Sequence, residues 1–274
     1  MKKLSFDLRV YPGSLLGFGS TFLTSLSAIN HALEKDIELY INILNHTYTS
    51  SENNWDIVFE QPFGITAAEA DSLEKCTDWD LGESVYSYHG DTRSKFQNNE
   101  FVDKQRKIFK DYVKPKKEIQ KTVNEFLKPY KDKKILGIHK RGRDHFTSGH
   151  ASGEGHKVSL NYVRGIIDKY INDYDYIYLT SDESEVYQFL SESYQEKFLF
   201  YDDKTEWGDN ESGLHALNTS AESKIQMIRD ICVEVLILSK CDRMLLMNSN
   251  ISHMGLFFSN TNDFEFYDTH VNYH

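Results

Sequence analysis

Residues 135–144 read Ile-Leu-Gly-Ile-His-Lys-Arg-Gly-Arg-Asp, an apolar stretch that runs into a strongly basic one. The apolar part is typical of a buried strand, and such a strand has no structural need for a histidine, two arginines and an aspartate at its end. In open α/β sheets, ligands bind at the carboxyl ends of the strands. Arginine keeps its charge and binds phosphate groups bidentately. The stretch therefore predicts one wall of an anion pocket, with His139, Arg141, Arg143 and Asp144 as its side chains.

A surface ion pair between Arg143 and Asp144 is the alternative interpretation of this stretch. It explains Arg143 well, but it leaves His139 and Arg141, which directly follow the strand, without a role. We therefore favour the anion pocket.

The composition indicates a folded, acidic protein. The chain has 274 residues, of which 39% are hydrophobic and 14% aromatic, so it can bury a large core. Its net charge of −11 argues against general binding to nucleic acid, which needs a basic face. The three cysteines have no CxxC spacing and indicate neither a disulfide framework nor a zinc site. Cys232 and Cys241 lie in apolar surroundings and are expected in the core.

The sequence contains no recognisable export or membrane-spanning signal. Charged residues at Asp7 and Arg9 interrupt any signal-peptide core. No run of about 18 apolar residues is present to form a transmembrane helix. We expect a cytoplasmic protein of bacterial type without a stable membrane span, and we leave peripheral membrane association and oligomeric state open.

Strand and helix patterns alternate along most of the chain. Residues 4–10 and 37–44 are expected as strands around a helix at 21–35, the usual opening of a parallel α/β sheet. The segment 45–99 is irregular, with a short strand expected at 56–59. The later part has clearer elements: strands at 134–138, 174–179, 197–201 and 243–247, and helices at 159–172, 185–193, 220–238 and 251–258. We predict two Rossmann-like, doubly wound domains that face a cleft, residues 1–115 and residues 116–274.

Three more turns carry glycines or polar residues where a helix begins. Gly17 and Gly19 open the first helix, where they either let a ligand approach the backbone or form a plain tight turn. Residues 180–183 (Thr-Ser-Asp-Glu) either bind the hydroxyls or base of a nucleotide or cap the next helix. Residues 247–252 offer the same choice between phosphate binding and capping. Three polar strand ends in one half of the chain predict a binding site at one edge of a sheet.

The loop at 147–156 carries Glu154 between His150 and His156. This spacing does not match the helical HExxH pattern of zinc sites. We therefore expect a mobile catalytic loop there rather than a metal site.

Several of these segments, in the same order, are similar to motifs of one enzyme family. Residues 137–144 resemble a Gly-Val-His-x-Arg-Arg-Thr-Asp motif, and residues 177–183 resemble a strand that ends in Thr-Asp-Asp. Residues 233–242 with Ser249 resemble a last helix, strand and Ser-Ser turn, and residues 17–20 resemble a Gly-x-Gly loop. The family is that of the α1,6-fucosyltransferases, including the rhizobial nodulation enzymes, and the related protein O-fucosyltransferases.

The resemblance implies a GT-B fold, GDP-fucose as donor, inversion at the anomeric carbon, and neither a metal nor another cofactor. Arg141 matches the essential arginine that binds the donor diphosphate, with help expected from Arg143 and His139. Glu154 lies near the family's loop carboxylate, which is the expected base. The remaining donor-binding positions implied by the resemblance are Gly17, Gly19, Asp144, Asp182, Glu183, Glu234 and Ser249.

The chain also departs from the family pattern. Gly142 stands where the family has a second arginine, so either Arg143 replaces it or the donor is held differently. Glu183 and Glu234 replace aspartates, which bears on base selectivity. We expect an inverting fucosyltransferase of polysaccharide biosynthesis with a glycan or lipid-linked saccharide acceptor. A transferase for another nucleotide sugar and a non-catalytic nucleotide- or glycan-binding protein remain the alternatives.

Overall fold

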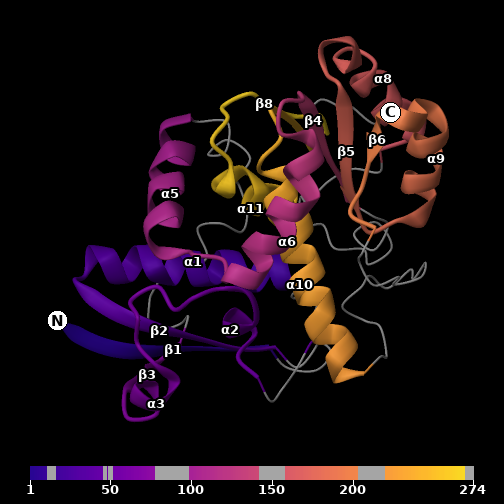
Figure 1. Cartoon of the computed structure of the whole chain (residues 1–274). Coiled ribbons are helices and arrows are strands. Elements are labelled where there is room, and N and C mark those ends of the chain that lie inside the picture. Colours follow the sequence, from indigo (N-terminus) through magenta and orange to yellow (C-terminus); the bar gives the residue numbers. More distant parts are fainter. Residues whose placement is uncertain are drawn as a thin grey trace. The chain divides into compact units, whose positions relative to one another are not determined.

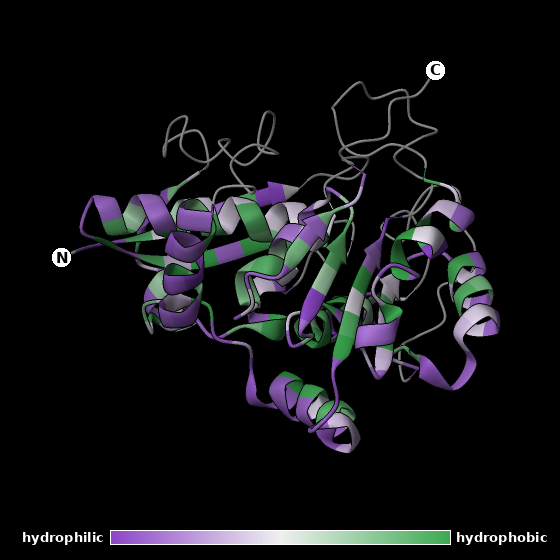
Figure 2. Ribbon diagram, turned by 90° about the horizontal axis from the view of Figure 1, so that it is seen from above, coloured by the Kyte–Doolittle hydropathy of each residue, from purple (hydrophilic) through white to green (hydrophobic). Residues whose placement is uncertain are grey.

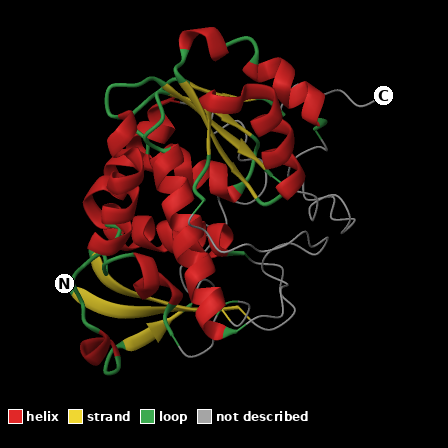
Figure 3. Ribbon diagram, turned by 45° about the vertical axis from the view of Figure 1, so that its right-hand side comes forward, coloured by secondary structure: helices red, strands yellow, loops and turns green. Residues whose placement is uncertain are grey.

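The structure is a computed structural model of the whole chain. It describes residues 1–10, 17–45, 48, 52–77, 99–141, 158–202 and 220–268. The chain divides into two compact units, the first made of Met1–Gln120 and Asn218–Cys232 and the second of Lys121–Leu217 and Val233–His274. Each unit contains its own sheet together with helices (Figure 3).

In the described residues, the first unit contains a three-stranded parallel sheet. Strand β1 (Lys2–Val10) is central, with β2 (Ile37–Asn45) on one side and β3 (Glu74–Cys76) on the other. Helix α1 (Phe18–Glu34) connects β1 to β2, and its residues 18–29 are all buried. The expected strand–helix–strand opening is therefore confirmed (Figure 1). The other described helices before residue 113 are α2 (Asn54–Val58), α3 (Ala67–Ala70) and α5 (Asn99–Tyr112).

The strand expected at residues 56–59 is wrong, because this segment lies in and just after helix α2. Asn53 caps the helix by accepting a hydrogen bond from the N–H of Trp55. The amide groups of Asn53 and Gln61 then bond to the backbone of the edge strand β2, at Ile41 and Ile43. Side-chain amides thus satisfy the open edge of the sheet, as a neighbouring strand would otherwise do.

The second unit contains a five-stranded parallel sheet among its described residues. The strands lie in the order β6-β5-β4-β7-β8, so the chain builds outward from β4 first to one side and then to the other. Ligands in such sheets bind where the order reverses, here between β4 and β7. The strands are β4 (Ile135–Lys140), β5 (Tyr176–Ser181), β6 (Phe198–Leu199), β7 (Arg243–Leu246) and β8 (Phe264–Phe266).

The helices that alternate with these strands begin close to their predicted positions. Ser159 caps α8 by accepting from the N–H of Tyr162. Helix α10 begins in the first unit and ends in the second. The helices are α6 (Lys117–Leu127), α8 (Leu160–Ile167), α9 (Ser184–Tyr194), α10 (Ala221–Leu238) and α11 (Asn250–Phe258).

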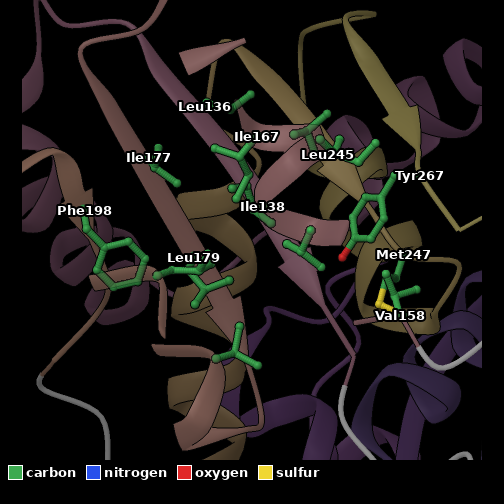
Figure 4. Close-up of a cluster of buried hydrophobic side chains, with 14 residues drawn as sticks. Leu136, Ile138, Val158, Ile167, Ile177, Leu179, Phe198, Leu245, Met247 and Tyr267 are labelled. Atoms are coloured by element: carbon green, nitrogen blue, oxygen red, sulfur yellow. The ribbon is translucent and has the colours of Figure 1, made fainter. Parts of the chain in front are cut away.

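The core of the second unit forms on the strands around β4. All six residues of β4 are buried, and hydrophobic residues run along the strands of both sheets (Figure 2). Ile138, Leu179 and Leu245 come from three neighbouring strands and pack together with Ile167 of α8 (Figure 4). This continuous apolar pattern is typical of parallel strands that are covered on both faces.

The opposite face of β4 requires a glycine. A Cβ atom on Gly137 would lie 2.8 Å from Cys241 Sγ and 2.8 Å from Leu238 Cδ1. Both cysteines expected in the core, Cys232 and Cys241, are buried. Close packing between β4 and the end of α10 therefore explains why position 137 is a glycine.

Candidate functional site

The polar ends of β4, β5 and β7 meet at one edge of the second sheet. In the strand register, His139 lies opposite Thr180 on one side and Leu246 on the other. The N–H of Arg141 donates to Sδ of Met247 at 3.3 Å. The structure thus brings together the three strand ends that the sequence pointed to, at the position where the strand order reverses.

Two buried ion pairs join the ends of β4 and β5. Arg141 pairs with Asp182, and Lys140 pairs with Glu183. The exposed fractions of the side chains are 21% for Arg141, 12% for Asp182, 7% for Lys140 and 14% for Glu183. Two cations and two carboxylates therefore balance each other in a largely water-excluded place.

Asp182 remains charged in this setting. Burial is the largest single cause and by itself raises the pKa of its carboxyl group, but the charge of Arg141, together with smaller effects that include Lys140 and a backbone hydrogen bond, lowers the pKa overall. An ionised carboxylate next to a guanidinium holds that guanidinium in a defined direction. Asp182 is thus placed to orient Arg141.

The turn at residues 180–183 leads into helix α9. Glu183 is the N-cap residue of this helix, and its own side chain makes no capping hydrogen bond. Ser181 Oγ accepts from the N–H of Glu183 at 3.3 Å, inside the turn. Lys140 was not among the candidate site residues, although a lysine at the end of a mostly apolar strand is a sequence signal for a buried partner.

His139 is a neutral residue that connects β4 to α11. Its Nδ1 atom lies 2.7 Å from Ser252 Oγ, and its carbonyl accepts from the hydroxyl of Tyr267 at 3.0 Å. Burial is the main cause that lowers the pKa of the ring to about 3. His139 therefore adds no positive charge at neutral pH, and the charge that we expected from it has to come from other residues.

Ser249 caps α11 at the end of β7. Its hydroxyl accepts from the N–H of Ser252 at 3.2 Å. The preceding N–H, of Asn248, donates to the buried carboxylate of Asp268 at 3.0 Å. Capping is thus realised, and it places the positive end of the α11 dipole beside β4, where an anion is favoured. Sequence reasoning missed Asp268, whose signal is an acidic residue two positions after the last described strand.

Glu234 lies in the last part of α10 and contacts Tyr187, which bonds to the end of β5. Its Oε1 atom accepts from the hydroxyl of Tyr187 at 3.1 Å, and the same hydroxyl accepts from the N–H of Ser181 at 2.9 Å. Burial and the charge of Glu234 raise the pKa of Tyr187 well above its ordinary value. Glu234 and Tyr187 therefore support the turn that carries Asp182, and Tyr187 is another residue that the sequence did not single out.

Gly17 and Gly19 belong to the first unit. Gly17 is the N-cap residue of α1, and Gly19 lies buried in the first turn. The N–H of Phe18 donates to the hydroxyl of Tyr48 at 3.0 Å, so one N–H at this helix start is bound by a side chain from the same unit. The carbonyl of Gly17 accepts from the N–H of Ser20 and of Thr21.

The remaining sequence candidates lie outside the described residues: Gly142, Arg143, Asp144, His150, Glu154 and His156. Within the described ranges, no three His, Cys, Asp or Glu side chains lie together in a way that could hold a metal ion. Among the same residues, no helix is both long enough and apolar enough to cross a membrane. The expectation of a metal-independent reaction stays a prediction.

Comparison with known proteins gives structural matches and no sequence matches. No family model and no curated protein sequence matches the chain. The α1,6-fucosyltransferase NodZ of Bradyrhizobium, co-crystallised with GDP, aligns with a TM-score of 0.59 over 94% of this chain and 93% of its own, at 15% identity. The chain has the fold of these fucosyltransferases.

Two further solved structures share the fold. POFUT1 in complex with GDP aligns with a TM-score of 0.51 over 97% of this chain and 98% of its own, at 10% identity. A point mutant of Arabidopsis thaliana FUT1 in complex with GDP aligns with a TM-score of 0.51 over 94% of this chain and 69% of its own, at 13% identity. The expected α/β fold with two Rossmann-like units is thereby confirmed.

Proposed function

We propose that this protein is an inverting glycosyltransferase that transfers fucose from GDP-fucose to a glycan or saccharide acceptor. The observation that carries the proposal is the placement of Arg141. It stands at the carboxyl end of β4, beside the point of strand-order reversal, and is oriented by Asp182. Structures with the same fold bind GDP or GDP-fucose, and this supports a nucleotide-sugar donor at the same edge of the sheet.

The donor diphosphate is proposed to bind between Arg141 and the start of α11. The guanidinium is held at one corner by Asp182, so its direction is set before a ligand arrives. The N-terminus of α11 favours negative charge through its N–H groups. Because His139 is neutral, Arg141 supplies the charge at this position. Lys140, which pairs with Glu183, adds a second cation close by.

In the transfer step, the bond between the sugar and the diphosphate breaks and negative charge develops on the leaving oxygen. A fixed cation in a water-poor site stabilises that charge without reorganising first. Removal of one such group typically lowers kcat by about 100- to 1000-fold. We propose this role for Arg141.

The acceptor hydroxyl has to lose its proton as it attacks. We propose Glu154 as the general base, in the loop that follows β4, and we propose that the reaction uses neither a metal ion nor another cofactor. The first unit is proposed as the acceptor side and the second as the donor side. A bacterial, cytoplasmic role in polysaccharide synthesis fits a glycan or lipid-linked acceptor.

Donor hydrolysis and transfer by Arg141→Ala test the catalytic role. We expect both rates to fall at least about 100-fold, measured on variant protein that a cooperative thermal unfolding transition shows to be folded. Unchanged hydrolysis and transfer would leave a binding protein as the better interpretation.

The donor class is tested by thermal unfolding with GDP or UDP. A ligand that binds only the folded protein raises its stability. We expect GDP to raise the midpoint and UDP to have little effect. Protection by UDP without protection by GDP would contradict a GDP-fucose donor.

A further inference from the structure

Phe200 exposes a large aromatic surface just after β6. Among the described residues, the large hydrophobic side chains that are clearly exposed are Phe200, at 40%, and Met1 at the chain start, at 77%. Phe198, two residues earlier on the same strand face, is buried in the core of the second unit (Figure 4). Phe200 therefore lies at the border of the core, next to the buried Phe198, and stays partly exposed to solvent.

The ring of Phe200 is held in place by two other rings. It packs edge-on against Tyr187, with ring centroids 5.7 Å apart, and lies 5.9 Å from the ring of Phe198. Tyr187 is itself fixed, because its hydroxyl accepts from the N–H of Ser181 at 2.9 Å and has the carbonyl of Ser181 and the carboxylate of Glu234 as alternative acceptors for its single proton. A partly exposed aromatic ring thus contacts the tyrosine that supports the turn carrying Asp182.

The strand order gives a direction to a bound nucleotide. With the diphosphate at the reversal between β4 and β7, the nucleoside extends along the carboxyl edge over the second strand of the unit, because the ribose of such ligands meets the acidic end of that strand. Here this strand is β5, which ends in Ser181, and β6 with Phe200 is its next neighbour.

We propose that the nucleobase of the donor stacks on Phe200. This inference rests on the proposed function and adds to it the residue that binds the base. Aromatic rings stack on every nucleobase because each base has a π-face, so Phe200 contributes affinity rather than selection among bases. Its partial exposure is then the surface that the base covers.

The test is calorimetric titration of the whole chain with GDP and, separately, with inorganic pyrophosphate. Pyrophosphate carries the same charge-bearing groups without a base. We expect Phe200→Ala to weaken GDP binding about 10- to 100-fold and to leave pyrophosphate binding unchanged. Phe200→Tyr keeps the ring and is expected to keep GDP binding within about 3-fold of the wild type.

A matched control comes from the opposite edge of the same sheet. Phe264 is a partly exposed phenylalanine at the start of β8, and Phe264→Ala is expected to change neither titration. Arg141→Ala serves as the reference for the proposed function, with both ligands weakened.

The outcomes separate the two ideas. If Phe200→Ala binds GDP as the wild type does while Arg141→Ala does not, the stacking inference is wrong and the proposed function stands. Equal weakening of GDP and pyrophosphate by Phe200→Ala would also overturn stacking, because the ring would then act on the shape of the anion site. Failure of the wild type to bind GDP overturns both.

Discussion

The two sheets each carry a polar cluster, one beside the edge strand β2 and one at the carboxyl ends of β4 and β5, and the two clusters differ in the groups that they contact. In the first unit, Asn53 and Gln61 bond to the backbone of Ile41, in the edge strand β2. In the second unit, the buried charges at the ends of β4 and β5 pair mainly with one another. The first cluster satisfies groups that the fold itself leaves open. In the second cluster the side chains form ion pairs with one another, and Lys140 Nζ also donates to the carbonyl of Arg141 at 3.4 Å.

This difference helps to separate structural from functional polar residues. Burying charges costs free energy that pairing only partly returns, and apolar side chains often stabilise a protein as well or better. Charges that gather at a ligand-binding edge of a sheet and form ion pairs there are therefore candidates for function. We expect the amides of the first unit to affect stability and the charges of the second unit to affect binding and catalysis.

Among the variants that keep Arg141, the largest effect is expected from Asp182→Asn. The substitution keeps the size of the side chain but removes the charge that orients Arg141, so kcat/KM for transfer should fall about 100-fold. Steady-state kinetics with the donor varied would show it. The pKa of Asp182 is lowered below its ordinary value of 3.8, so the carboxylate is ionised throughout the range from pH 5 to 8. Its protonation should therefore not change the transfer rate within that range.

Asp263→Asn is the matched control for Asp182→Asn. Asp263 pairs with Arg243 near the opposite end of β7 and is 49% exposed. Its loss should leave kcat/KM unchanged. If both variants lose activity to the same extent, the ion pair at the end of β4 has no special role.

Gly137→Ala should lower the free energy of unfolding by about 2 kcal/mol, because the added methyl group meets Cys241 and Leu238 in a packed core. Urea unfolding measures this. The affinity of the folded fraction for GDP should not change. This result would show that residues 135–144 include both residues needed for packing and residues needed for binding.

Gly165→Ala is the control for Gly137→Ala. A Cβ atom on Gly165 meets nothing within 4 Å, and alanine favours a helix more than glycine does. This variant should be slightly more stable than the wild type. Equal destabilisation by both substitutions would argue against the packing explanation.

His139→Asn should change how stability depends on pH. The folded-state pKa of His139 is lowered to about 3, so between that value and the ordinary 6.5 the unfolded chain binds the extra proton. Wild-type stability is therefore present above pH 6.5 and falls as the pH decreases. The difference between wild type and variant should change by about 1 to 2 kcal/mol from pH 6.5 to pH 5.

Unfolding curves of wild type and His139→Asn at matched pH values provide the measurement, since the other histidines cancel in the difference. A difference that is constant over this range would mean that His139 is protonated in the folded protein, and the neutral ring would then be the wrong description.

The smallest effect is expected in the first unit. Gln61→Ala removes the amide that bonds to Ile41 and should cost about 1 kcal/mol of unfolding free energy. GDP binding should be unaffected. Gln188→Ala, on an exposed surface where the side chain bonds to Glu192, is the control, with little change expected. A loss of GDP affinity in Gln61→Ala would break the distinction between the two clusters.

Much of the second unit could be predicted from the sequence. The strands β4, β5 and β7 could be recognised as apolar runs that end in polar residues. Because the strands are parallel, their carboxyl ends lie at the same edge of the sheet. Arg141, Asp182 and Ser249 were found in this way. What the sequence could not show is which charges contact each other, because Arg141 and Asp182 are far apart along the chain and only the strand register brings them together.

The elements and residues that the sequence did not predict are very short strands and helices, and side chains that act through long-range hydrogen bonds. Strands β3 and β8 have three residues each, too few for an alternating pattern to be recognised. Helix α2 has five residues and depends on the cap from Asn53 and on contacts with β2 rather than on periodicity. Tyr187 and Asp268 act through hydrogen bonds to strand ends that no local pattern encodes.

The most direct test of the account compares GDP binding by Arg141→Ala and Arg243→Ala in calorimetric titrations. Both arginines belong to the same sheet and form carboxylate pairs, but Arg141 follows the carboxyl end of β4 and Arg243 begins β7. If Arg141 binds the donor diphosphate, Arg141→Ala loses at least about 100-fold in affinity and Arg243→Ala keeps wild-type affinity. Equal affinities in the two variants would contradict this role of Arg141.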